Sequence, residues 1–69
     1  MPIIEMHLME GRTTDQKRRV MAAVANAAAQ ALDMPLGNVR ILITEHRADE
    51  FSVAGVSVAE KQESLPVSP

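Results

Sequence analysis

The sequence predicts an α+β fold: a β-α-β unit with parallel strands, followed by a short C-terminal hairpin or an edge arm. Three segments predict it. Residues 3–8 alternate with the period of a strand, residues 13–32 are rich in alanine behind a helix start signal, and residues 39–45 are β-branched and mostly apolar. A strand, a helix and a strand joined by one crossover indicate parallel pairing with a right-handed connection.

The first strand is expected to carry apolar side chains on one face. Alternation places Ile4, Met6 and Leu8 on one face and Ile3, Glu5 and His7 on the other. A two-residue period indicates a strand that turns one face toward a core. Gly11 then ends the strand.

The helix is expected to begin with a capping box. Thr13 precedes the first turn, Gln16 follows three residues later, and Asp15 lies in the electropositive first turn. Alanine then favours helix as far as Leu32. The expected apolar stripe, at helical spacing, consists of Val20, Val24, Ala27, Ala28, Ala31 and Leu32. A proline and a glycine in residues 35–37 end the helix.

The second strand, residues 39–45, is apolar on both faces, which is typical of a central strand. Residues 51–58 alternate weakly around a glycine, and we expect a short hairpin or an edge arm there. Residues 1–58 are therefore predicted to form a single domain. Residues 59–69 are predicted to form a polar tail, loose unless a partner subunit orders it.

Composition narrows the classes of function. A chain of 69 residues is one domain at most, and a body of this size buries only about 60% of its unfolded surface. Since 46% of the residues are hydrophobic and no disulfide can supplement the small core, we expect copies of the chain to associate and so bury apolar surface. The net charge of −2 argues against a nucleic-acid partner. Without metal-ligand spacing, a membrane-length apolar run or a signal peptide, we expect a soluble, cytoplasmic oligomer without a membrane partner.

The amino terminus offers a reactive group. A small second residue favours removal of Met1, and Pro2 would then carry a free secondary amine, a base held rigidly at the start of a buried strand. If Met1 is retained, Pro2 is an amide and this chemistry is blocked. Because parallel strands start at the same end, Arg40 is expected near Pro2. A cation beside an amine lowers the pKa of that amine, and an arginine can bind a carboxylate with two hydrogen bonds.

Two further residues complete a candidate site. Arg12 stands ahead of the helix, where free backbone N–H groups favour anions. It lies at the opposite end of its strand from Pro2, so it would reach Pro2 only from another subunit. Phe51, the single aromatic residue, would be an apolar wall. Each residue also has a simpler interpretation, as a surface charge, a loop charge or a core side chain.

Six short segments together carry a family resemblance. They are Pro2-Ile3, residues 7–12, Gln16-Lys17, residues 32–36, residues 39–45 and Phe51. Through them the chain resembles, without a gap from Pro2 to about Gly55, the short-chain 4-oxalocrotonate tautomerase (2-hydroxymuconate tautomerase) family of the tautomerase superfamily. The resemblance implies a β-α-β unit with a terminal hairpin, assembled as dimers into a homohexamer.

The resemblance also implies a cofactor-independent isomerase of aromatic catabolism. The family's amino-terminal proline, matched by Pro2, takes the hydroxyl proton of a 2-hydroxydienoate and returns a proton to a distal carbon. Arg40 would hold the C1 carboxylate and the 2-oxygen of this small carboxylate substrate, and Arg12 would hold the far carboxylate from a different subunit. The apolar pocket would be lined by Leu8, Phe51 and Val53. No metal is implied.

Departures from the family pattern leave other hypotheses open. Asp49-Glu50 are acidic, Gln62-Glu63 replace arginines, and Ser52 and Ala54 replace glycines. Glu50 is a candidate water activator, which would suit a hydratase or dehalogenase of small unsaturated acids; its simpler interpretation is a solvated loop charge. A third hypothesis is a non-catalytic oligomeric binding protein that kept the fold.

Overall fold

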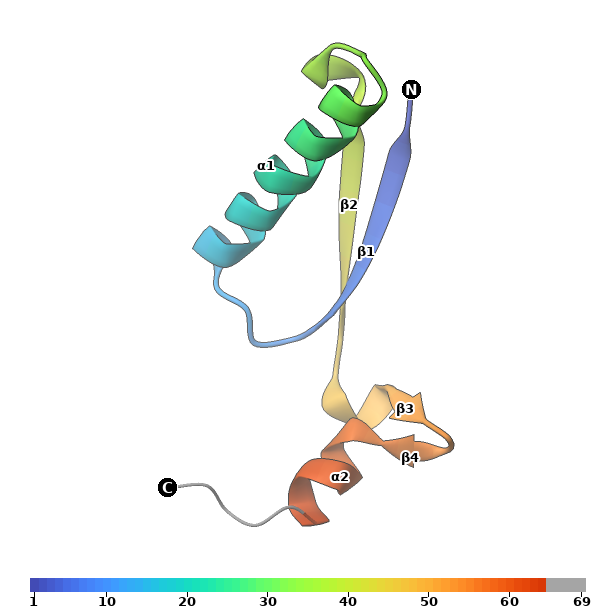
Figure 1. Cartoon of the computed structure of the whole chain (residues 1–69). Helices are drawn as coiled ribbons and strands as arrows, with labels where there is room; N and C mark the ends of the chain where they lie inside the picture. Colours follow the sequence, from blue (N-terminus) through green and yellow to red (C-terminus); the bar gives the residue numbers. More distant parts are fainter. Residues whose placement is uncertain (65–69) are drawn as a thin grey trace.

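The structure is a computed structural model that describes residues 1–64 (Figure 1). Its elements in order are β1 (Ile3–Met9), α1 (Thr14–Ala31), the 3-10 turn η1 (Leu36–Asn38), β2 (Arg40–His46), the 3-10 turn η2 (Ala48–Glu50), β3 (Ser52–Val53), β4 (Val56–Ser57) and α2 (Val58–Ser64). The predicted β-α-β unit and terminal hairpin are confirmed. No helix in this part of the chain has the length and hydropathy needed to cross a membrane.

β1 and β2 pair in parallel along their whole length, from Ile3 beside Arg40 to Met9 beside His46. The side chains that β1 and β2 half-bury alternate as predicted, and α1 lies over that face of the sheet (Figure 1). The prediction of a central second strand is not met within one chain. β2 pairs only with β1 in the described residues, so both strands are edges until another copy adds to them.

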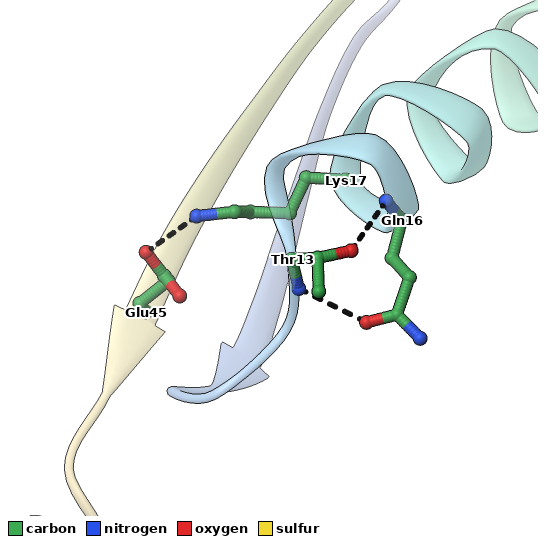
Figure 2. A network of polar contacts seen from close by, with 4 residues as sticks. All are labelled: Thr13, Gln16, Lys17 and Glu45. Atoms are coloured by element: carbon green, nitrogen blue, oxygen red, sulfur yellow. Dashed lines mark hydrogen bonds and ion pairs between the residues drawn. The ribbon is translucent and has the colours of Figure 1, made fainter.

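The start of α1 is the predicted capping box. The Gln16 N–H donates to the Thr13 hydroxyl at 3.1 Å, and the Thr13 N–H donates to the Gln16 side-chain carbonyl at 3.0 Å (Figure 2). Two of the N–H groups that a helix start leaves unpaired are thereby satisfied. The helix begins where the sequence predicted it.

The apolar face of α1 differs from the predicted stripe. The side chains that it covers in whole or in part are Lys17, Val20, Met21, Val24, Ala25, Ala28 and Ala29, whereas Ala27, Ala31 and Leu32 are exposed. The prediction was wrong at Ala27 and Ala31, where a small side chain gives little apolar area to set the buried face, and at Leu32, which lies beyond the last helical residue as the C-cap.

α1 ends in a Schellman motif, with Asp33 in the left-handed conformation at φ 51°. The Met34 N–H donates to the Ala29 carbonyl at 3.0 Å, and the Asp33 N–H donates to the Gln30 carbonyl at 3.3 Å. Glycine is the usual residue at this position, because a side chain there costs about 1 kcal/mol or more. An acidic side chain also opposes the negative end of the helix dipole.

Asp33→Gly is therefore expected to raise the free energy of unfolding by about 1 kcal/mol, through relief of the left-handed strain and of the charge. The matched control is Gln30→Gly, one turn earlier on the same helix, which is expected to lower it by about 1 kcal/mol. Urea unfolding at one fixed protein concentration measures both. A loss of stability in both variants would contradict the explanation.

The C-terminal part of the described chain is a hairpin followed by a helix. β3 and β4 pair antiparallel, and the two turn residues between them, Ala54 (φ 56°) and Gly55 (φ 82°), both have positive φ. Such a pair of angles matches the twist of a two-residue hairpin. Alanine thus occupies a position that glycine fills without strain, and the hairpin forms nevertheless.

Residues 59–64 of the predicted polar tail belong to the helix α2. Ser57 begins this helix as a second capping box. Its hydroxyl accepts from the Glu60 N–H at 3.1 Å, and the Glu60 carboxylate accepts from the Ser57 N–H at 3.2 Å. The Ser-x-x-Glu spacing was the sequence signal that could have predicted this start. Residues 65–69 of the predicted tail lie outside the described residues.

A single chain leaves most of its apolar surface uncovered. Among the described residues Ala29 alone is a buried hydrophobic residue, at 8% exposure. Ile3 and Leu42, on the sheet face away from α1, are 64% and 50% exposed. The radius of gyration is 16.0 Å, against about 11 Å for a compact chain of this length. The hairpin and α2 extend beyond the end of the sheet (Figure 1), so one chain alone does not close a core.

Candidate active site

The starts of the two parallel strands bring Pro2 and Arg40 together. The Arg40 N–H donates to the Pro2 carbonyl at 3.0 Å, so the predicted neighbourhood is present in the backbone. The Arg40 side chain hydrogen-bonds through Nη1 to the carbonyl of Gly37 at 2.6 Å. An arginine has five N–H donors, so this bond holds the guanidinium while leaving others for an anion.

The amino terminus is accessible at this end of the sheet. Met1 is 73% exposed, whereas Pro2 is half-buried against the strand pair. Removal of Met1 would leave the Pro2 amine on a ring whose position is fixed by its carbonyl bond to β2. The geometry therefore suits a base that cannot move freely.

Arg12 and Leu8 meet at the opposite end of β1. A cavity of about 280 Å³ lies between this strand end and the first turns of α1. It is lined by Leu8, Arg12, Gln16, Lys17 and Val20. The structure gives Arg12 no hydrogen bond or ion pair within residues 1–64, so its guanidinium is available to a ligand. A cation beside apolar walls suits the carboxylate end of a small molecule.

Lys17 is a lining residue that the sequence analysis did not assign to the site. Its ammonium lies 3.0 Å from the Glu45 carboxylate, so the side chain reaches from α1 to β2 (Figure 2). Glu45 lies beside Leu8 in the strand register. The signal in the sequence was weak: a lysine in the first helical turn, next to an arginine in the preceding loop.

Phe51 and Val53 are not among the residues that line the cavity at Arg12 and Leu8. The Phe51 ring is 6.0 Å from that of His46, centre to centre, and Val53 is exposed on β3. His46 in turn lies with its Nε2 2.8 Å from the Nδ1 of His7, and their rings stack. The sequence analysis did not connect these two histidines. They are on different strands, and only the parallel register brings them together.

Asp49 and Glu50 are both bound by Arg47. The Arg47 guanidinium donates to the two Asp49 carboxylate oxygens at 3.1 and 3.0 Å and lies 3.5 Å from Glu50. These are exposed ion pairs beside the strand end. The hypothesis of Glu50 as a water activator therefore gains no support from the geometry, which matches its interpretation as a loop charge.

The two halves of the candidate site lie at opposite ends of one strand. From Pro2 to Leu8 is six residue steps, about 20 Å at the usual rise of a strand, and Arg12 lies beyond Leu8. A single chain cannot bring Arg12 to Pro2 without unfolding β1. Pro2 and Arg12 of one chain therefore do not reach the same small ligand.

Comparison with known proteins gives matches over most of the chain. A family model described as tautomerase enzyme matches residues 2–61. The 2-hydroxymuconate tautomerase of Pseudomonas sp. (strain CF600) is 44% identical over 55 residues, which are 80% of this chain and 87% of that protein.

Solved structures agree with this match. Among the 4-oxalocrotonate tautomerase isozymes from Methylibium petroleiphilum, one structure is 47% identical with a TM-score of 0.90, covering 93% of this chain and all of the other. A heterohexamer 4-oxalocrotonate tautomerase from Chloroflexus aurantiacus J-10-fl is 40% identical with a TM-score of 0.84, covering 87% of this chain and 97% of the other. The residues matched by the family model include every candidate site residue.

Proposed function

The chain belongs to the tautomerase enzyme family, and from that premise we propose that it is an isomerase that ketonises 2-hydroxymuconate or a similar small 2-hydroxydienoate. The observation that carries the proposal is a match over 80% of this chain to a 2-hydroxymuconate tautomerase, in a chain that places Pro2 beside Arg40. We also propose that the protein is cytoplasmic, as expected from the sequence.

In the proposed mechanism, Pro2 acts first as base and then as acid. Its free amine takes the proton of the 2-hydroxyl group, the double bonds shift along the dienolate, and the same proton equivalent is returned to a distal carbon. The product is the conjugated ketone. One group that accepts and then donates a proton is sufficient for such a shift. No step requires a metal ion or an organic cofactor.

The two arginines would stabilise the charge that this shift creates. Arg40 would bind the C1 carboxylate and the 2-oxygen, where negative charge develops. Arg12, from another subunit, would bind the far carboxylate and draw electron density toward it. The apolar walls at Leu8, Phe51 and Val53 would exclude water and so strengthen these electrostatic contacts.

We propose that the working form is a homohexamer built from dimers. The uncovered sheet face, the extended hairpin and the separation of the two site halves all favour further copies, and the relative from Chloroflexus aurantiacus is itself a heterohexamer. Leu42 is the third residue of β2 and lies exposed on the sheet face that α1 does not cover. Burial of such apolar side chains is the expected driving force for assembly.

Leu42→Glu is expected to break this assembly, because a carboxylate would be buried without a partner. Sedimentation velocity should show the unchanged protein near six times 7.5 kDa, about 45 kDa, and the variant at a lower mass. Arg18→Glu, a charge reversal at an exposed position of α1, is the control and should leave the mass unchanged. A Leu42→Glu protein that still sediments as a hexamer would contradict the assignment of this face.

The proposed activity is tested by the ultraviolet rate of 2-hydroxymuconate ketonisation. The protein is first shown by intact mass to lack Met1 and by sedimentation to be oligomeric. Turnover well above the rate in buffer supports the proposal. A rate equal to that of buffer from processed, assembled protein would overturn it.

A further inference from the structure

Lys17 lines the same cavity as Arg12 and Leu8. We propose that Lys17, held in place by Glu45, is a second cation at the carboxylate-binding end of the site and determines the preference for dicarboxylate over monocarboxylate substrates. The inference rests on the proposed function, because the far carboxylate is placed at Arg12 there.

The position of the ammonium group supports this role. Lys17 leaves the first turn of α1 and lies 3.0 Å from Glu45, which is beside Leu8 in the parallel register (Figure 2). Its side chain is 26% exposed, whereas that of Arg19 on the same helix is 76% exposed. The charge is thus held at the strand end that forms one wall of the cavity. Glu45 occupies one of three ammonium N–H donors, and two are left for a ligand.

The charges of the cavity predict the direction of the preference. Arg12 and Lys17 bring two positive charges to about 280 Å³ with apolar walls from Leu8 and Val20, and Glu45 brings one negative charge. A substrate with a second carboxylate gains attraction from both cations, more strongly than in water because the walls are apolar. A substrate with one carboxylate, bound at the far end of the site by Arg40, gains nothing here.

Lys17 and Glu45 should therefore affect the preference in opposite directions. Loss of the Lys17 charge removes an attraction for the second carboxylate. Loss of the Glu45 charge removes a repulsion between Glu45 and the second carboxylate of the substrate. It also leaves the positive charge of Lys17 without a neutralising partner, so that Lys17 attracts this carboxylate more strongly. If the Lys17–Glu45 ion pair only stabilised the packing of α1 on β2, removal of either charge would change the substrate preference in the same direction.

The test compares kcat/KM for 2-hydroxymuconate with kcat/KM for 2-hydroxypenta-2,4-dienoate, which has hydrogen in place of the far carboxylate. Lys17→Met should lower the ratio of the two values by about tenfold, mainly through a higher KM for the dicarboxylate. Lys17→Arg, which keeps the charge, should retain at least part of the ratio. Glu45→Gln should raise the ratio severalfold.

The control pair is Asp15 and Arg19, an ion pair at 3.6 Å on the same helix with both side chains more than three-quarters exposed. Asp15→Asn and Arg19→Met should leave the ratio unchanged. If the Lys17→Met protein does not assemble, the inference is tested by Glu45→Gln alone, through the direction in which this variant changes the ratio of the two kcat/KM values. Equal losses on both substrates in Lys17→Met and Glu45→Gln, or a lower ratio in Glu45→Gln, would overturn the inference. Failure of the unchanged protein to turn over either substrate would instead overturn the proposed function.

Discussion

Pro2→Ala is expected to lower kcat/KM for 2-hydroxymuconate about 100-fold or more, in protein whose intact mass shows that Met1 is absent. Alanine keeps an amine but loses the ring that stops rotation about the N–Cα bond, so the lone pair of the base is no longer held in one direction beside Arg40. The Pro2 carbonyl that accepts the Arg40 N–H is retained in the variant. Strand pairing and assembly should therefore persist, which sedimentation velocity checks.

The matched control keeps the ring and blocks the amine. A chain with one glycine left ahead of Pro2 retains the proline conformation, but its nitrogen is an amide and has no basic lone pair. It should be as inactive as Pro2→Ala while assembling normally. Full activity in the glycine-extended protein would show that the nitrogen of Pro2 is not the base.

Mixing two inactive variants is expected to restore activity. Pro2→Ala chains and Arg12→Ala chains, unfolded and refolded together in equal amounts, should recover about a quarter of the activity of the unchanged protein. Each site needs an intact Pro2 from one chain and an intact Arg12 from another, and each is present in half of the chains. The expectation follows from the position of these residues at opposite ends of β1.

Each variant refolded alone serves as the control and should stay inactive. Arg12→Ala is expected to lose activity because the far carboxylate then has one partner fewer, and Arg12 has no structural bond within residues 1–64 whose loss would disturb the fold. A mixture no more active than its two components would show that Pro2 and Arg12 of one site come from the same chain. The proposed assembly would then be wrong.

The β-α-β order and the start of α1 could be predicted because they depend on local chemistry. A two-residue period and a Thr-x-x-Gln capping box depend only on residues close together in the sequence, and both are present in the structure. The apolar face of α1 was harder to predict because its alanines carry little directional information. α2 was missed because its capping box begins at Ser57, in the segment interpreted as a hairpin or an edge arm, and its other residues fall in the segment interpreted as a tail.

The arrangement of the candidate site could be predicted only in part. The neighbourhood of Pro2 and Arg40 follows from parallel pairing alone. The pairing of Lys17 with Glu45 depends on how α1 is rotated over the sheet, and that of His7 with His46 depends on the exact strand register. Neither is encoded in the spacing of residues along the chain. The place of Phe51 depends on how copies meet, which a single sequence does not state.

The distance between the two ends of β1 also bears on how such a chain can evolve. In the proposed assembly the base and the far cation of one site come from different copies, so neither copy has to hold both. After duplication of the gene, one product could lose Pro2 and the other could lose Arg12, and mixed assemblies would still contain working sites. The two products would then depend on each other, and selection would preserve both.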